Sequence, residues 1–385
     1  MKRLNILHFS SLGIWDIKPG AGRVSTYLPL KGQIDRGHSV TFISSYGTVK
    51  TGDYEGIKCR KIWIPFSKSR PFIRLLMLPL SDFCFFFKGF SEARKEKPDI
   101  VYCHCTISVF PAFIIAKLFD AKFVIRLYGT GTAAFSKKKY PSYLFRKRCL
   151  KHKADAYILA NDGTASDKLA IRLGVSKEKI HFLKNGIKKV VDLTKDEQLK
   201  KSLAPHGEKI VITVSRLQNG KQVDLIIKMM PKLVKFLPVK LAIIGDGPEK
   251  EALNNLVDEL NVRENVIFLG GKKQREVYRY LNVADVFVSM NYLSSMSNPV
   301  FEAMICGKPV VALNKGTTTD LIHHNENGIV IEEEQLCELP VMVAELLQDD
   351  ERLTKIGQNA RQYMLDNWPT WEERVKQEVD LIEKL

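Results

Sequence analysis

The sequence alternates short apolar segments with longer helical patterns, and it does so in two successive halves. The apolar segments cover residues 3–13, 40–43, 98–105, 121–130 and 154–162, and then 208–214, 239–248, 265–271, 284–290, 308–313 and 327–331. Short buried strands separated by helices are typical of parallel sheets covered on both faces. The pattern predicts an α/β fold of two doubly wound, Rossmann-like domains facing a cleft, with ligands at the carboxyl ends of the strands.

A charged segment, residues 185–209, separates the two halves and contains a Pro-His-Gly break. We therefore expect an N-terminal domain over residues 1–190 and a C-terminal domain over residues 191–368. Residues 369–385 form an amphipathic pattern opened by Pro369, which suits the first position of a helix. This last helix can pack back on the N-terminal domain.

The charge of the chain is divided unevenly between the halves. Residues 1–190 hold 35 Lys and Arg against 13 Asp and Glu, whereas the remainder holds 24 against 30, for a total of +16. A basic half favours an anionic partner: a membrane surface, a phosphate-bearing substrate or nucleic acid. Solubility alone is the alternative. The stretch 62–90 mixes aromatic, aliphatic and basic residues, so it suits either a packed core or a membrane-facing surface.

Cysteine usage points to a reducing compartment, and hydropathy predicts no membrane-spanning helix. The seven cysteines are scattered without a Cys-x-x-Cys pair, so no disulfide framework is expected. The N-terminus is too short and polar for a signal peptide, and no apolar run reaches the roughly 18 residues of a spanning helix. Cys103, His104 and Cys105 could suggest a metal site, but strand alternation sends His104 to the opposite face from the two cysteines. We therefore expect no metal.

Two basic residues in one loop of the second half suit a bound diphosphate. Arg216 and Lys221 lie five positions apart between a strand and a helix. The planar guanidinium and the compact ammonium can hold a diphosphate from two sides.

Glycines follow the next two strands of this half. Gly245 and Gly247 let the backbone approach a ligand closely, and Pro248 opens the following helix. Gly270 ends the next strand in a turn against which a flat base can lie.

The stretch 298–311 predicts a short helix with a sharply defined start, followed by a strand. Asn298 is a suitable N-cap, Pro299 suits the first helical position, and Gly307 suits the C′ position. Such a start presents N–H groups that favour phosphate. Glu302 then fits if it reaches past the phosphate to hydroxyl groups.

In this order and at these spacings, the motifs resemble those of glycosyltransferase family 4, a retaining, metal-independent family of the GT-B fold that uses nucleotide diphosphate sugars. The resemblance runs through nearly the whole chain and is strongest over residues 209–330. It implies catalytic roles for Arg216 and Lys221 at the donor diphosphate and for Glu302 at the ribose hydroxyls. The donor-binding residues it implies are Gly20, Gly22, Gly245, Gly247, Pro248, Gly270, Ser294, Asn298, Pro299 and Val300.

Two positions depart from the family pattern, both on the sugar-handling side. Ser294 stands where the family usually has an acidic residue, eight positions before the glutamate. Tyr128 stands where the family often has a histidine, after the strand 123–127. With Arg126, Tyr128 is expected on the acceptor side, in the domain that binds the acceptor.

The sequence thus predicts a hexosyltransferase that moves a sugar, from a donor such as a UDP-sugar, to an acceptor with retention of configuration. A lipid-linked acceptor in cell-surface polysaccharide or glycoconjugate biosynthesis is the expected case. The leaving diphosphate would help to deprotonate the acceptor while fixed charges stabilise it. We expect no cofactor or metal, no nucleic acid, and a cytoplasmic protein held peripherally on the anionic inner face of the membrane.

Three alternatives remain at this level. A nucleotide-sugar epimerase on the same fold would need acid and base groups at the sugar. A nucleotide-sugar-binding protein without turnover is conceivable because of Ser294. A nucleic-acid binder would explain the charge, but it leaves the Arg-x4-Lys and Asn-Pro features unexplained.

Overall fold

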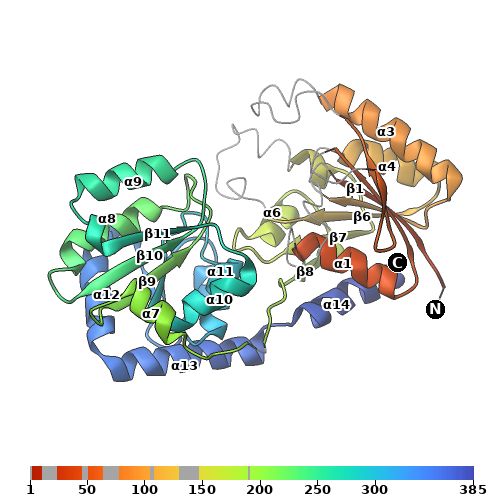
Figure 1. Ribbon diagram of the computed structural model, residues 1–385. Coiled ribbons are helices and arrows are strands. Elements are labelled where there is room, and N and C mark those ends of the chain that lie inside the picture. Colours follow the sequence, from red (N-terminus) through yellow and green to blue (C-terminus); the bar gives the residue numbers. More distant parts are fainter. Residues whose placement is uncertain are drawn as a thin grey trace. The chain divides into compact units, whose positions relative to one another are not determined.

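The computed structural model describes residues 2–10, 24–45, 51–63, 78–104, 108–129, 147–189 and 191–385. The chain divides into two compact units, each built around its own sheet (Figure 1). Unit 1 comprises Met1–Gly186 and Trp371–Leu385, and unit 2 comprises Ile187–Thr370. The last helix therefore belongs to unit 1, although it follows unit 2 in the sequence.

Unit 1 contains a sheet that, in its described part, has eight strands. Its order is β3-β4-β2-β1-β5-β6-β7-β8, and only the β3–β4 pair is antiparallel among these pairs. The strands are β1 (Asn5–Ser10), β2 (Ser39–Ser44), β3 (Gly52–Tyr54), β4 (Ile57–Lys61), β5 (Ile100–His104), β6 (Lys122–Leu127), β7 (Ala156–Ala160) and β8 (Ile180–Leu183). The helices are α1 (Val24–Asp35), α3 (Leu78–Lys95), α4 (Val109–Leu118), α6 (Ser166–Arg172) and α14 (Trp371–Glu383).

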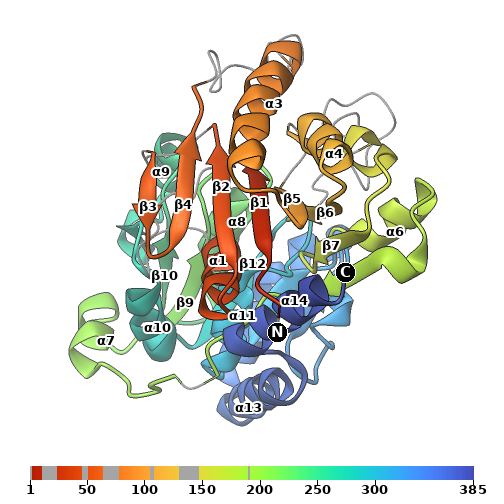
Figure 2. The same ribbon diagram turned by 90° about the vertical axis from the view of Figure 1, so that its right-hand side faces the viewer.

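Helices cover both faces of the unit 1 sheet because successive strand side chains point to opposite sides. On one face, Phe85 of α3 and Ile115 of α4 pack with Phe9 of β1. On the other face, Leu30 of α1 packs over Phe42 of β2, and α14 packs there as well. Figures 1 and 2 show α1 and α14 side by side, away from α3 and α4.

Unit 2 contains a six-stranded parallel sheet with the order β11-β10-β9-β12-β13-β14 among its described residues. Its strands are β9 (Lys209–Val214), β10 (Val239–Ile244), β11 (Val266–Gly270), β12 (Val286–Ser289), β13 (Val310–Leu313) and β14 (Ile329–Ile331). Its helices are α7 (Glu197–Leu203), α8 (Val223–Leu233), α9 (Lys250–Glu259), α10 (Gln274–Val283), α11 (Asn298–Ile305), α12 (Leu339–Gln348) and α13 (Asp350–Asn367).

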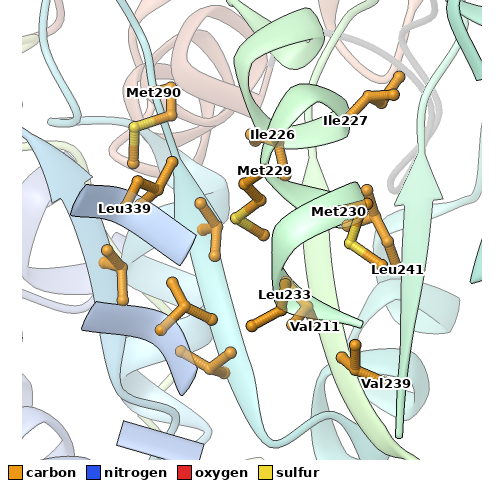
Figure 3. Close-up of a cluster of buried hydrophobic side chains, with 14 of the residues drawn as sticks. Val211, Ile226, Ile227, Met229, Met230, Leu233, Val239, Leu241, Met290 and Leu339 are labelled. Carbon is orange, nitrogen blue, oxygen red and sulfur yellow. The ribbon is translucent and has the colours of Figure 1, made fainter. Parts of the chain in front are cut away.

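The core of unit 2 lies on both faces of this sheet. On one face α8 buries Ile226, Met230 and Leu233 against Val211 and Leu241, as Figure 3 shows. The spacing of these helix residues keeps them on one side of α8, which fixes the helix against the strands. Helices α10, α11 and α13 pack on the opposite face.

The strand order locates the ligand-binding edge of each unit. In unit 1, β1 pairs with β2 on one side and β5 on the other. In unit 2, β9 pairs with β10 on one side and β12 on the other. At such points the chain leaves the sheet in opposite directions, and a crevice opens at the carboxyl ends of the strands.

Candidate active site

A pocket in unit 2 lies where the strand order reverses. It is lined by the end of β9, by the residue that ends β12 and by the start of α11. The lining residues are Thr213, Val214, Ser215, Arg216, Lys221, Ser289, Asn291, Ser297 and Pro299. Arg216 and Lys221, called the clamp below, thus meet the predicted helix start in one pocket. The loop that carries them, residues 215–221, is called the clamp loop.

Arg216 and Lys221 both line this pocket. The side chain of Arg216 is exposed, and within the described residues it has no hydrogen-bond or ion-pair partner. The Gly220 carbonyl accepts a hydrogen bond from the Tyr292 backbone N–H at 3.0 Å. This bond joins the clamp loop to the loop after β12, so the two sides of the pocket are held together.

The glycines at 245 and 247 lie against the backbone of the loop that carries Arg216. A Cβ atom on Gly245 would lie 1.8 Å from the carbonyl oxygen of Ser215, and one on Gly247 would lie 2.1 Å from that of Leu217. The Leu217 N–H also donates to the Asp246 carbonyl at 3.0 Å. The two glycines therefore let their loop approach the clamp loop, rather than a ligand alone.

Pro248 and Gly270 belong to the same backbone arrangement. Pro248 does not open α9 as predicted, because it precedes the N-cap Glu249. The Glu249 N–H donates to the Leu217 carbonyl at 3.0 Å. The Gly270 carbonyl accepts from the Gly245 N–H at 3.0 Å, and Gly270 itself has a φ of 68°. These contacts continue the packing of the loops at this edge of the sheet.

Helix α11 begins one residue earlier than predicted. The N-cap is Ser297, with extended backbone, and Asn298 is the first helical residue. No side chain of the described residues caps this helix, so the N–H groups of Asn298 and Val300 are left pointing out of the first turn. The Asn298 prediction was wrong because the exposed Asn298 already has helical backbone, yet the uncapped start still favours an anion.

The end of α11 follows the prediction. Gly307 has a φ of 69°. Its N–H donates to the Met304 carbonyl at 2.9 Å, and the Lys308 N–H donates to the Ala303 carbonyl at 3.0 Å. This is the Schellman pattern, which a residue with positive φ at C′ completes.

Glu302 lies buried in α11, one turn after the helix start. Its Oε1 accepts a hydrogen bond from Nε2 of Gln274 at 2.6 Å. Burial raises the pKa of Glu302 to about 7, and the bond from Gln274 only partly opposes this rise. No cation pairs with the carboxylate among the described residues, so it is suited to neutral donors such as hydroxyl groups.

Ser294 is buried, and its hydroxyl oxygen accepts a hydrogen bond from the Met296 N–H at 3.0 Å. The neighbouring Ser295 N–H donates to the Thr318 hydroxyl at 3.0 Å. These bonds shape the loop that precedes α11. The hydroxyl of Ser294 therefore has a structural use in this loop.

Of the four site residues expected in unit 1, only Tyr128 lies where a ligand can reach it within the described residues. Gly20 and Gly22 lie outside the described residues. Arg126 is fully buried rather than available to an acceptor, since it donates to Glu378 at 2.8 Å and to the Ser25 carbonyl at 2.7 Å. Tyr128, half-buried just beyond the end of β6, is the member of this pair that a ligand can reach.

Sequence reasoning missed the polar residues behind Tyr128. His8, Gln33 and His104 are buried together, and His104 bonds to the Tyr128 hydroxyl at 2.7 Å. Nothing in the sequence joins residues this far apart. The described side chains form no group of three or more His, Cys, Asp or Glu that could hold a metal ion.

Comparison with known proteins assigns both halves of the chain. Residues 20–189 match the model of Glycosyltransferase Family 4, and residues 194–363 match the model of Glycosyl transferases group 1. The chain belongs to glycosyltransferase family 4. It is a hexosyltransferase with the two parallel-sheet domains of the GT-B fold.

Individual relatives of this family 4 enzyme cover most of its length. N-acetyl-alpha-D-glucosaminyl L-malate synthase of Bacillus anthracis is 25% identical over 355 residues, covering 91% of this chain and 90% of the relative. A 4-alpha-N-acetylgalactosaminyltransferase of Campylobacter jejuni, named for a diphospho-undecaprenol substrate, is 28% identical over 251 residues, or 64% of this chain and 66% of its own. The structure of Anabaena HepE in complex with UDP-glucose matches all of both chains, with a TM-score of 0.75 and 17% identity.

The described part of the chain contains no helix with the length and apolar character needed to cross a membrane.

Proposed function

We propose that this glycosyltransferase transfers a hexose from a nucleotide diphosphate sugar to a glycan or lipid-linked acceptor, with retention of configuration. The observation that carries the proposal is the unit 2 pocket, in which Arg216, Lys221 and the uncapped start of α11 converge. Two cations and a helix N-terminus suit a diphosphate. The HepE complex with UDP-glucose supports a UDP-sugar as the first donor to test.

The donor would lie with its diphosphate in this pocket and its ribose against Glu302. The carboxylate is one turn into α11, and its single described side-chain partner is the neutral amide of Gln274. Ribose hydroxyls would donate to it and favour its ionised form. The base would lie near the turn at Gly270.

In the proposed reaction the bond from the anomeric carbon to the diphosphate oxygen breaks, and a bond to the acceptor oxygen forms on the same face of the sugar. The acceptor proton passes to the departing diphosphate, so no side chain need act as a covalent nucleophile. Arg216, Lys221 and the α11 N–H groups stabilise the charge that develops on the diphosphate. With these groups in place, we propose that transfer does not require a metal ion.

Unit 1 would bind the acceptor and hold the enzyme on an anionic membrane. Phe83 and Phe87 of α3 are 60% and 54% exposed, and their ring centroids lie 4.4 Å apart. Leu80 is exposed on the same side, so the three residues, called the α3 stripe below, follow helical spacing. The rest of α3 buries Phe85 and Gly89, so the stretch 62–90 combines core and exposed aromatic residues within its described part.

The α3 stripe lies in the half that carries 35 Lys and Arg against 13 Asp and Glu. Aromatic side chains bury readily at a bilayer interface, while a basic surface is attracted to anionic lipids. The enzyme would then bind a lipid-linked acceptor at the membrane in which that lipid lies. The diphospho-undecaprenol in the name of the Campylobacter relative is in keeping with this choice.

A protein that binds nucleotide sugars without transferring them is the second candidate, since the hydroxyl of Ser294 is buried and bonded within its own loop. A panel of UDP-, GDP- and ADP-sugars separates the two. Each is incubated with the protein and with alkyl glycosides as model acceptors, and released nucleoside diphosphate and new glycosides are measured. A transferase releases diphosphate from one donor class and forms a glycoside, whereas a binding protein binds that donor and releases nothing.

A further inference from the structure

Five polar side chains of unit 1 are joined in one continuous series of hydrogen bonds, which runs from Gln33 to Tyr128 and on to Thr26. Gln33 Oε1 lies 2.8 Å from His8 Nε2, and His8 Nδ1 lies 2.8 Å from His104 Nε2. His104 Nδ1 lies 2.7 Å from the Tyr128 hydroxyl, which accepts from the Thr26 hydroxyl at 2.9 Å. The chain crosses β1, β5 and the end of β6, at the point where the strand order of unit 1 reverses.

The two histidines in this chain are neutral. Burial lowers the pKa of His8 to about 3, although the bond to Gln33 acts in the opposite direction. Burial, His8 and Arg126 together hold the pKa of His104 well below its ordinary value. Glu378, whose charge acts to raise the pKa of His8, already binds Arg126 and Tyr102.

Neutral imidazoles give the chain a single direction. Each ring has one N–H donor and one acceptor nitrogen, and the amide oxygen of Gln33 can only accept. His8 therefore donates from Nε2 to Gln33 and accepts at Nδ1 from Nε2–H of His104. Nδ1 of His104 in turn accepts the Tyr128 proton, so toward a ligand the phenol oxygen acts as an acceptor.

The chain cannot carry a net proton, because the amide at its far end does not take one up. Its physical effect is to fix the hydroxyl of Tyr128. The Tyr128 ring is also held, since the Arg126 guanidinium carbon lies 4.8 Å from its centroid and the His104 ring stacks at 6.0 Å with an angle of 15°. Hydrogen bonds in series polarise one another, which strengthens the acceptor at the end of the chain.

We propose that Gln33, His8 and His104 are positioning residues that act through Tyr128, orienting its phenol oxygen to accept a hydrogen bond from a sugar hydroxyl group. This proposal rests on the proposed function, in which unit 1 handles the sugar acceptor. The hydroxyl belongs either to the donor sugar or to the acceptor. Both share the chemistry of a neutral hydroxyl donor.

The histidine tautomers give a direct test that needs no substrate. In ¹⁵N-histidine-labelled protein, long-range ¹H–¹⁵N spectra should show both rings as neutral Nε2–H tautomers from about pH 5 to 9, with His104→Gln used for assignment. Gln33→Leu should change the His8 tautomer. An Nδ1–H tautomer or a charged ring in the wild type overturns the proposal, whatever the outcome for donor turnover.

A double-mutant cycle tests whether the chain acts through Tyr128. Tyr128→Phe should lower kcat/KM about tenfold, the effect of one hydrogen bond of roughly 1.4 kcal/mol. Gln33→Leu or Thr26→Val should lower it severalfold alone but add nothing to Tyr128→Phe, and Thr26→Ser should restore it. Nucleoside diphosphate affinity, measured in parallel, should stay unchanged. Equal effects of Gln33→Leu with and without Tyr128→Phe contradict the proposal.

Two arms identify the source of the hydroxyl. Diphosphate release from the sugar nucleotide with water as acceptor reports on the donor sugar, and transfer to alkyl glycosides reports on the acceptor. If Tyr128 bonds to a hydroxyl of the donor sugar, Tyr128→Phe should slow diphosphate release with water as acceptor. If Tyr128 bonds to the acceptor, only transfer to alkyl glycosides should be slowed. Wild-type rates in both arms overturn the proposal, whereas failure of the wild type to bind nucleoside diphosphate counts against the proposed function instead.

Discussion

Gln274 donates a hydrogen bond of 2.6 Å to Glu302, and this neutral amide is the one described side chain that bonds to the buried carboxylate. Burial raises the pKa of Glu302 to about 7, so near neutral pH the carboxyl group is protonated in a large fraction of molecules. Hydroxyl donors from a ligand would favour the ionised form. A bound ribose would therefore lower the pKa of Glu302 and favour loss of its proton.

Binding of the intact donor near pH 7 should release protons from Glu302. A sugar nucleotide has no phosphate proton of its own to lose at this pH, so the release reports on the protein. Titration calorimetry in buffers of different ionisation enthalpy should show a substantial fraction of one proton released per donor bound, which vanishes in Glu302→Gln. Equal release by both proteins would place the titrating group elsewhere.

Glu302→Gln should stabilise the unliganded protein at alkaline pH. The folded pKa of Glu302 is raised above its unfolded value, so the contribution of this group to stability is fully present below about pH 4.5 and is lost as pH rises through about 7. At pH 8 we expect a gain of about 3 kcal/mol, or several degrees in the unfolding midpoint. At pH 5 the two proteins should melt alike, and a gain of the same size at both pH values would contradict the assignment.

Gly247→Ala should disrupt the clamp loop. The added Cβ would lie 2.1 Å from the backbone oxygen of Leu217, which cannot move without displacing its neighbour Arg216. We expect a loss of about 2–3 kcal/mol in stability together with weaker nucleoside diphosphate binding. Gly271→Ala is the matched control, since its nearest neighbour would be Asp246 Cβ at 4.0 Å. Similar behaviour of the two variants would refute the role given to Gly247.

The α3 stripe should mediate binding to anionic vesicles. Phe83→Ser combined with Phe87→Ser should weaken flotation with phosphatidylglycerol-containing vesicles severalfold, because these exposed rings would enter the interface. Binding should also fall between low salt and physiological salt, where the screening length is about 8 Å. Phe236→Ser, which removes an exposed phenylalanine of unit 2, is the control. If the double variant and Phe236→Ser lose vesicle binding to the same extent, the α3 stripe is not the membrane-binding surface.

The parallel strands and the clamp could be predicted from the sequence because each depends on local pattern. Strands β9 and β10 are mostly apolar, and the spacing of Arg216 and Lys221 fixes both at one loop. The β3–β4 hairpin was not predicted. Its turn has positive φ at Glu55 and Gly56, and Glu-Gly is a weaker turn signal than Asn-Gly or Asp-Gly.

Contacts between distant residues could not be predicted. The contacts of Gly245 and Gly247 with Ser215 and Leu217, on another strand's loop, could not be read from the sequence. Arg126 suggested an exposed cation, but Glu378 of the last helix neutralises it in the interior. A charged residue in an apolar strand can therefore indicate a buried partner that only the fold reveals.

Arg216 and Lys221 are proposed to hold a nucleoside diphosphate, and a calorimetric titration measures this binding without any need for an acceptor. The nucleoside diphosphate is titrated into the wild type, Arg216→Ala, Lys221→Ala and the control Lys232→Ala, which removes an exposed lysine of α8. We expect Arg216→Ala and Lys221→Ala each to lose about 1.5–3 kcal/mol of binding free energy, roughly 10- to 150-fold in affinity, while the control binds like the wild type. Wild-type affinity in both clamp variants would contradict it.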